Sequence, residues 1–157
     1  MITETTSTVS DSNITQKIAR VVQACKDVYP TQKETCNFFV RDVYLKLTGV
    51  TLTGNADTLV DTFSGEKSGW KKTTAADSVG QVNIGKFVVA GLKSGEHKNA
   101  AHGHVAVVVQ GTLYRGKYPV VWCGGSERGR SEGTKSVGEV WAPGDRDNVK
   151  YFVSTEY

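Results

Sequence analysis

The sequence predicts an α+β protein in which N-terminal helices pack on an antiparallel β-sheet. Apolar residues recur at helical spacings in the first part of the chain, up to about residue 63. Short β-branched and aromatic runs, separated by glycine-rich turns such as "QGTLYRGKYP" and "CGGSERGRSEG", follow in the second half. Helices that precede strands in this way are typical of the α+β class, whose sheet is antiparallel.

The chain has 157 residues, the length of one domain. We expect a polar tail over residues 1–13 and a single domain over residues 14–157. The net charge of +3 is small and no run of Lys or Arg occurs, so nucleic-acid binding is not predicted. No apolar stretch reaches the roughly 18 residues of a membrane span, and the first residues lack the features of a signal peptide. We therefore expect synthesis in the cytoplasm and no membrane insertion.

The first predicted helix begins at Ile14 and places its apolar residues on one face. Asn13 can cap it, with Gln16 three residues later as in a capping box. Pro30 should end it, because a proline disfavours helical geometry at the preceding Tyr29.

Two further helices are expected before the strands. The second runs from about residue 35 to 47, with Phe39, Val43 and Leu47 in one stripe and Gly49 suited to the C-cap. A third and shorter helix is expected over residues 56–63. The expected strands are residues 87–90, 105–109, 120–122 and 151–153, with residues 137–141 as a further candidate.

Three cysteines are present, at wide spacings that fit neither a disulfide framework nor a zinc site. Cys25 lies on the apolar stripe of the first helix and is expected in the core. Cys36 lies in the first turn of the second helix, where the helix dipole stabilises a thiolate and lowers the thiol pKa. Cys36 is therefore the candidate nucleophile.

A cysteine nucleophile needs a neighbouring base, usually a histidine. His97 lies in the polar loop "KSGEHKNAA" and should face solvent, and His102 lies in the loop before a strand. His104 adjoins that strand, where the sheet can hold it rigidly as a base requires. A cysteine at a helix start followed by a histidine on one of the first strands is the chain order of papain-like cysteine peptidases.

Longer segments carry a narrower resemblance. The segments "KETCNFFVRDVYLKLTGVTLTGNADTLVD", "FVVAGLKSGEHKNAAHGHVAVVV", "YRGKYPVVWCGG" and "TKSVGEVWAPGDRDNVKYFV" resemble the type VI secretion amidase effectors of the first family, in the same order. The resemblance covers about residues 14–154. "GHVAVVV" is shared with other papain-like cell-wall hydrolases, whereas "LYRGKYPVVWCGG", "KSVGEVW" and "DRDN" are more specific.

The resemblance implies a papain-like, NlpC/P60-type fold and hydrolysis of the γ-D-glutamyl–meso-diaminopimelate bond in peptidoglycan peptide stems. Residue by residue, it implies Cys36 as nucleophile and His104 as base, without metal or cofactor. It also implies delivery by the type VI secretion apparatus into the periplasm of a recipient cell. An immunity protein that occludes the active site is the implied partner in the producing cell.

The third member of the catalytic group is open. In this fold it comes from the strand after the histidine strand, where Cys123 of "WCGG" can offer its sulfur or its carbonyl to the imidazole. The alternative is a structural cysteine at a strand end. Trp122 is expected in the core, and Asp61, a conceivable orienting group, is expected on a solvated helix face.

Two features bear on substrate binding. Many papain-like cell-wall peptidases have Ser-Gly after the nucleophile, but here Asn37 and Phe38 follow Cys36, and the phenyl ring adds bulk beside the thiol. Basic residues at the rim would help to bind the carboxylates of a peptide stem. The candidates for that rim, which are otherwise simply solvated, are Lys117, Arg128 and Arg130.

Two other functions compete with this one. A phage-type or housekeeping thiol amidase has a similar core but often carries a separate wall-binding domain, for which this chain has no room. A non-catalytic module that binds wall peptides or a partner protein predicts that Cys36 reacts with iodoacetamide no faster than Cys25.

Overall fold

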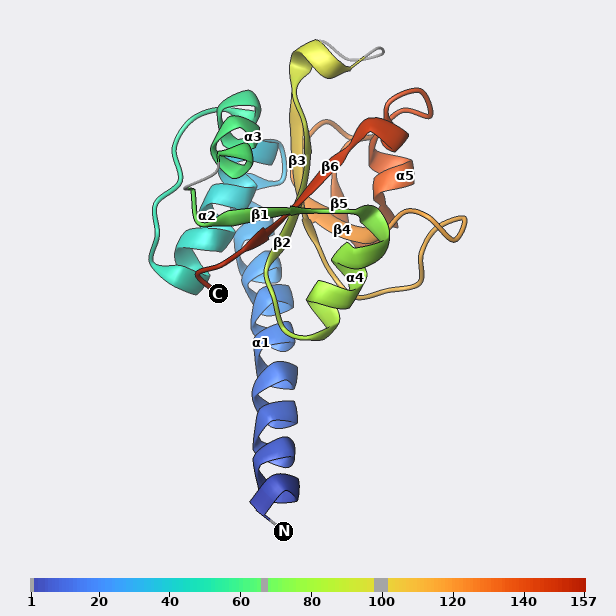
Figure 1. Ribbon diagram of the computed structural model, residues 1–157. Helices are drawn as coiled ribbons and strands as arrows, with labels where there is room; N and C mark the ends of the chain where they lie inside the picture. The colour runs from blue at the N-terminus through green and yellow to red at the C-terminus, as the bar shows by residue number, and fades with distance from the viewer. Residues whose placement is uncertain (1, 66–67, 98–101) are drawn as a thin grey trace.

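The computed structural model describes residues 2–65, 68–97 and 102–157, and it shows helices packed on a six-stranded sheet (Figure 1). The strand order is β1-β6-β2-β3-β4-β5 and each neighbouring pair is antiparallel. The strands are β1 (Trp70–Thr73), β2 (Val88–Leu92), β3 (His104–Val108), β4 (Val120–Cys123), β5 (Ser131–Ser136) and β6 (Lys150–Ser154). The predicted α+β class and antiparallel sheet are confirmed.

Helices cover both faces of the sheet. The helices are α1 (Ile2–Gln32), α2 (Cys36–Thr48), α3 (Ala56–Ser64), α4 (Ala75–Asn83) and α5 (Val137–Val140), with 3-10 turns η1 (Ser94–Glu96) and η2 (Arg146–Asn148). Side chains alternate along β3, because successive residues of a strand point to opposite faces. Val105 and Val107 join the core formed with α1, α2 and α3, whereas Ala106 and Val108 join the core formed with α4 and α5.

Helix α1 is longer than the sequence predicts. It begins at Ile2, so Asn13 is not its N-cap, and it continues through Pro30 to Gln32. No Gly or Pro interrupts residues 2–29, and Ser and Thr are only weakly unfavourable in a helix. Pro30 lies in the last turn, where the missing N–H removes one hydrogen bond near an end that frays in any case.

The N-terminal half of α1 extends away from the rest of the fold (Figure 1). The division into a tail over residues 1–13 and a domain over residues 14–157 stays a prediction. Within the described residues, no helix combines the length and the apolar character needed to cross a membrane.

The next two helices confirm the predictions closely. Helix α2 ends at Gly49, whose left-handed backbone (φ 76°) lets its N–H donate to the Leu45 carbonyl at 2.8 Å. The side chain of Asn55 caps α3 by accepting a hydrogen bond from the Thr58 N–H at 2.9 Å. These two caps fix the end of α2 and the start of α3, the two helices that flank the site.

Strands β1 and β5 and helix α4 were not predicted, and the strand candidate at residues 137–141 forms a helix instead. Strands β1 and β5 are edge strands whose outward residues are polar, so they lack the apolar runs that mark inner strands. Helix α4 contains Gly80, which weakens its helical signal. Residues 137–141 were expected to form a strand, but a capping box between Ser136 and Glu139 starts the short helix α5 there.

Candidate active site

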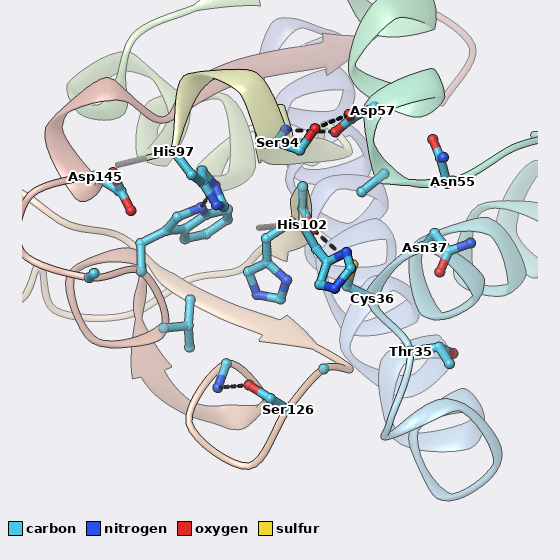
Figure 2. A pocket seen from close by; sticks show the side chains of 18 of the residues that line it. Thr35, Cys36, Asn37, Asn55, Asp57, Ser94, His97, His102, Ser126 and Asp145 are labelled. Carbon is cyan, nitrogen blue, oxygen red and sulfur yellow. Dashed lines mark hydrogen bonds between the residues drawn. The ribbon is translucent and has the colours of Figure 1, made fainter. Parts of the chain in front are cut away.

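A pocket of about 620 Å³ opens where the starts of α2, α3 and β3 meet the loops that follow β4 and α5 (Figure 2). Cys36 and Asn37 lie on one side of it, and His97 and Asp145 lie on the opposite side (Figure 2). His104 also lines the pocket, so the structure brings the predicted nucleophile and base into one cavity. They are 68 positions apart in the sequence, and the packing of α2 on β3 joins them.

Cys36 is the first residue of α2 and is half-buried. Its thiol points toward the Gly103 carbonyl oxygen, which lies 3.9 Å from the sulfur. The backbone N–H of Val105 also faces the sulfur. The thiol therefore contacts the main chain on both sides of His104.

The net effect on the Cys36 thiol differs from the expectation of a lowered pKa. Burial raises the pKa of Cys36, because it penalises the charged thiolate. The N–H groups of Val105, Asn37 and Cys36 itself favour the thiolate, as the helix start predicts, but they do not outweigh burial. The nearby Asp57 carboxylate raises the pKa of Cys36 further.

His104 is the first residue of β3, paired with Leu92 of β2, so the sheet holds it as predicted. Burial lowers the pKa of His104 from its ordinary 6.5 to about 4, although the Gly129 carbonyl favours the charged ring. The buried Nε2 atom has no hydrogen-bond partner at bonding geometry among the described residues. At neutral pH the ring is therefore uncharged.

Cys123 lies behind the pocket wall. It is fully buried at the end of β4, and its sulfur donates a hydrogen bond to the Gly129 carbonyl at 3.2 Å. The group beside the imidazole is thus the Gly129 carbonyl, and Cys123 holds that carbonyl. The role of Cys123 as third catalytic member stays a prediction. Its position behind the Gly129 carbonyl favours an effect on His104 that passes through that carbonyl.

Glycines form the part of the wall that faces the imidazole. A Cβ atom on Gly125 would lie 3.1 Å from Cε1 of His104, and one on Gly129 would lie 3.7 Å from Nε2. At Gly125 only a residue without a side chain lets the main chain approach the ring this closely, whereas the distance at Gly129 is an ordinary van der Waals contact. The glycine-rich sequence predicted close approach to a ligand, but the close approach in the structure is to His104.

Asp57 is a site residue that sequence reasoning missed. It lies in the first turn of α3, and its Oδ1 and Oδ2 atoms accept hydrogen bonds from the N–H and hydroxyl of Ser94, at 2.8 and 2.5 Å. Burial raises the pKa of Asp57, but the two Ser94 bonds, Lys93 and His97 outweigh it and hold the pKa below its usual range. The only signal in the sequence was an acidic residue near a helix start.

His97 does not face solvent as predicted. It is half-buried, lines the pocket, and its Nε2 accepts a hydrogen bond from the indole N–H of Trp141 at 3.2 Å. The ring of Trp141 in turn lies against the His104 imidazole, with ring centroids 4.7 Å apart and planes at 61°. No local pattern in the sequence links these three residues.

The predicted basic rim is not part of the pocket. None of Lys117, Arg128 and Arg130 lines it, and the charged side chains that line its described part are Glu34, Asp57 and Asp145. Arg130 nevertheless lies next to the lining, because its Nε atom donates to the carbonyl of Ser126 at 3.4 Å.

The remaining predictions concern residues around the pocket. Phe38 is 43% exposed and lies against the Arg41 guanidinium at 4.9 Å, outside the pocket lining, so its ring adds no bulk there. Asp61 forms an exposed ion pair with Lys93 at 2.8 Å, as expected for a solvated helix face. Trp122 and Cys25 are both in the core, as predicted.

A metal does not fit the described part of the site. No group of three or more His, Cys, Asp or Glu side chains among the described residues is arranged to hold a metal ion. The Asp57 carboxylate is already engaged by Ser94, and the Cys36 thiol contacts main-chain groups. What the arrangement offers is a half-buried thiol and an uncharged imidazole in one pocket.

Comparison with known proteins shows the family of the chain. No family model matches the chain. The chain is similar to the peptidoglycan amidase Tse1 of Pseudomonas aeruginosa, with 39% identity over 142 residues that cover 85% of this chain and 88% of Tse1. Similarity of this extent over nearly the whole length of both chains confirms the family that the sequence motifs predict. The chain belongs to the family of the peptidoglycan amidase Tse1.

Proposed function

We propose that this protein is a cysteine amidase of papain-like fold that cleaves peptide stems of peptidoglycan. One observation carries the proposal: the Cys36 sulfur lies against the main chain on both sides of His104, and both residues line one pocket. The substrate class rests on the similarity to a peptidoglycan amidase. The bond, γ-D-glutamyl–meso-diaminopimelate, rests on the resemblance to the effector family.

In the first step, His104 acts as general base. Burial keeps the thiol of Cys36 protonated and the imidazole of His104 uncharged before the reaction. The proton moves from sulfur to His104 as the sulfur attacks the γ-glutamyl carbonyl. The helix-start N–H groups that face the sulfur are placed to stabilise the oxyanion. The C–N bond then breaks, and the imidazolium of His104 gives its proton to the leaving amine of diaminopimelate.

In the second step, water hydrolyses the thioester. His104, uncharged again, accepts a proton from the attacking water. The C–S bond breaks, the sulfur of Cys36 regains a proton, and the new carboxyl group of glutamate leaves. The Gly129 carbonyl orients the imidazole through both steps, with Cys123 holding that carbonyl.

The acidic lining of the pocket bears on the substrate. Glu34, Asp57 and Asp145 favour the remaining amino group of diaminopimelate over its carboxylates, since opposite charges attract. We therefore infer that the diaminopimelate side of the scissile bond binds in the pocket.

The biological setting follows from the resemblance to the effector family. We propose delivery by type VI secretion to the periplasm of a recipient cell, and an immunity protein that covers the pocket in the producing cell. The proposed immunity protein blocks the access of substrate to Cys36 and His104.

Mass spectrometry of soluble products from purified peptidoglycan tests the proposed bond. The predicted products end in D-glutamate on one side and begin with diaminopimelate on the other, and Cys36→Ala yields neither. Products cut at another bond would contradict the proposed specificity. An unchanged yield from Cys36→Ala would contradict the proposed mechanism.

A further inference from the structure

His97 and Trp141 come from distant parts of the chain and meet beside the pocket. His97 follows η1, and Trp141 follows α5, where its backbone N–H donates to the Val137 carbonyl at 3.1 Å. The indole of Trp141 is nearly fully buried, at 2% exposure, and its N–H points at Nε2 of His97. An indole N–H can only donate, so the bond requires an acceptor at this position.

The indole bond is the hydrogen bond that ties His97 to Trp141. Nε2 of His97 accepts it from the indole N–H at 3.2 Å. The Nδ1 atom of the same ring is buried and has no hydrogen-bond partner among the described residues. Among the described residues, the indole bond is thus the hydrogen bond that holds this ring.

The other side of the indole contacts the proposed base. The Trp141 and His104 rings meet edge to face at 4.7 Å, a geometry in which the indole limits rotation of the imidazole. Gly125 also approaches the imidazole with bare main chain, since a Cβ atom there would lie 3.1 Å from Cε1 of His104. The His104 ring is therefore contacted both by the indole and by the main chain of Gly125.

We propose that His97 is a positioning residue, which through its hydrogen bond to Trp141 keeps the indole against His104 and so keeps the base aligned with Cys36. The inference rests on the proposed role of His104 as base. His97 takes no proton from substrate in this account. Its contribution is the orientation of a neighbouring ring.

Three variants separate this role from a general structural one. His97→Gln keeps an oxygen acceptor for the indole, His97→Leu keeps similar bulk without an acceptor, and Trp141→Phe keeps an aromatic ring without the donor. The assay is hydrolysis of a soluble peptide stem, with kcat and KM measured separately and thermal unfolding followed for each variant. Cys36→Ala is measured beside them.

His97→Leu is expected to lower kcat about tenfold to 100-fold, as a misaligned catalytic group does, with KM unchanged. His97→Gln should restore most of kcat, and Trp141→Phe should lose as much as His97→Leu. The double variant of Trp141→Phe and His97→Leu should lose no more than either alone. Equal kcat in His97→Gln and His97→Leu, whether both high or both low, would overturn the inference.

A poorly folded His97→Leu leaves Trp141→Phe as the deciding variant, since it removes the same hydrogen bond from the other side. Full kcat in folded Trp141→Phe would also overturn the inference. Failure of the proposed function has a different signature: Cys36→Ala is then as active as the parent protein, whatever the His97 variants do.

Discussion

The thiol of Cys123 donates a hydrogen bond to the Gly129 carbonyl, 3.2 Å away, and that carbonyl faces the imidazole of His104. The cysteine predicted as the third catalytic group therefore lies one hydrogen bond behind the ring. The histidine is oriented by main chain, and the main chain is held by a buried thiol. This relationship gives the first of five predictions.

Cys123→Ala and Cys123→Ser should differ in activity. Serine keeps a donor for the Gly129 carbonyl, whereas alanine leaves the carbonyl unheld. Since one hydrogen bond contributes about 1 kcal/mol, we expect kcat/KM to fall roughly 3- to 10-fold in Cys123→Ala and less in Cys123→Ser. Equal activity of the two variants in the peptide-stem assay would show that the thiol does not act through Gly129.

The charge of Asp57 should raise the pKa of the nucleophile. Asp57→Asn keeps an acceptor for Ser94 but removes the negative charge that disfavours the Cys36 thiolate. We expect the pKa of Cys36 to fall and its alkylation by iodoacetamide to become faster at neutral pH. Asp61→Asn is the matched control on the same helix, because Asp61 pairs with Lys93 at the surface. A rate in Asp57→Asn no faster than in the control would contradict the prediction.

Gly125 should not tolerate a side chain. Its backbone has φ 152°, and an added Cβ would lie 3.1 Å from Cε1 of His104. We expect Gly125→Ala to lower the free energy of unfolding by about 1–3 kcal/mol and to displace the imidazole, with loss of activity. Gly80→Ala in α4, where an added Cβ meets nothing within 4 Å, should instead stabilise by about 0.5–1 kcal/mol. Denaturant unfolding and the peptide-stem assay on both variants check this contrast.

Burial of His104 predicts a pH dependence of stability. The folded pKa of about 4 lies below the ordinary 6.5, so as pH falls below 6.5 the unfolded chain binds a proton that the native state does not. The free energy of unfolding should fall by up to about 1.4 kcal/mol for each pH unit.

Urea unfolding between pH 6.5 and about pH 5 follows this effect, because the ordinary pKa values of Asp57 and Glu96, 3.8 and 4.5, lie below that range. The variant His104→Gln should lack the part of the slope that His104 contributes. An identical slope in both proteins would mean that the imidazole is not held uncharged by burial.

The sequence predicted the elements that carry strong periodic signals. Helices α2 and α3 and the inner strands β2, β3, β4 and β6 have apolar faces and clear caps or turns, and the structure has them within a few residues. The edge strands β1 and β5 were missed because an edge exposes polar residues. The start of α1 was missed because Ser and Thr give little helical signal.

For the site, local sequence was enough to nominate Cys36 and His104 as candidates. The supporting groups could not be found in the same way, since they act through space. Asp57 reaches Ser94 across 37 positions and His97 reaches Trp141 across 44 positions. The sign of the Cys36 pKa shift was wrong because a helix-start argument omits burial, which the fold alone determines.

The most direct test of the account compares peptidoglycan cleavage by Cys36→Ala and Cys25→Ala, with both variants shown to be folded. Cys25 is fully buried in the core formed with α1, away from the pocket lining, so its removal should affect stability more than activity. We predict that Cys36→Ala cleaves peptidoglycan at least about 1000-fold more slowly than the parent protein, while Cys25→Ala stays active. Undiminished cleavage by folded Cys36→Ala would contradict it.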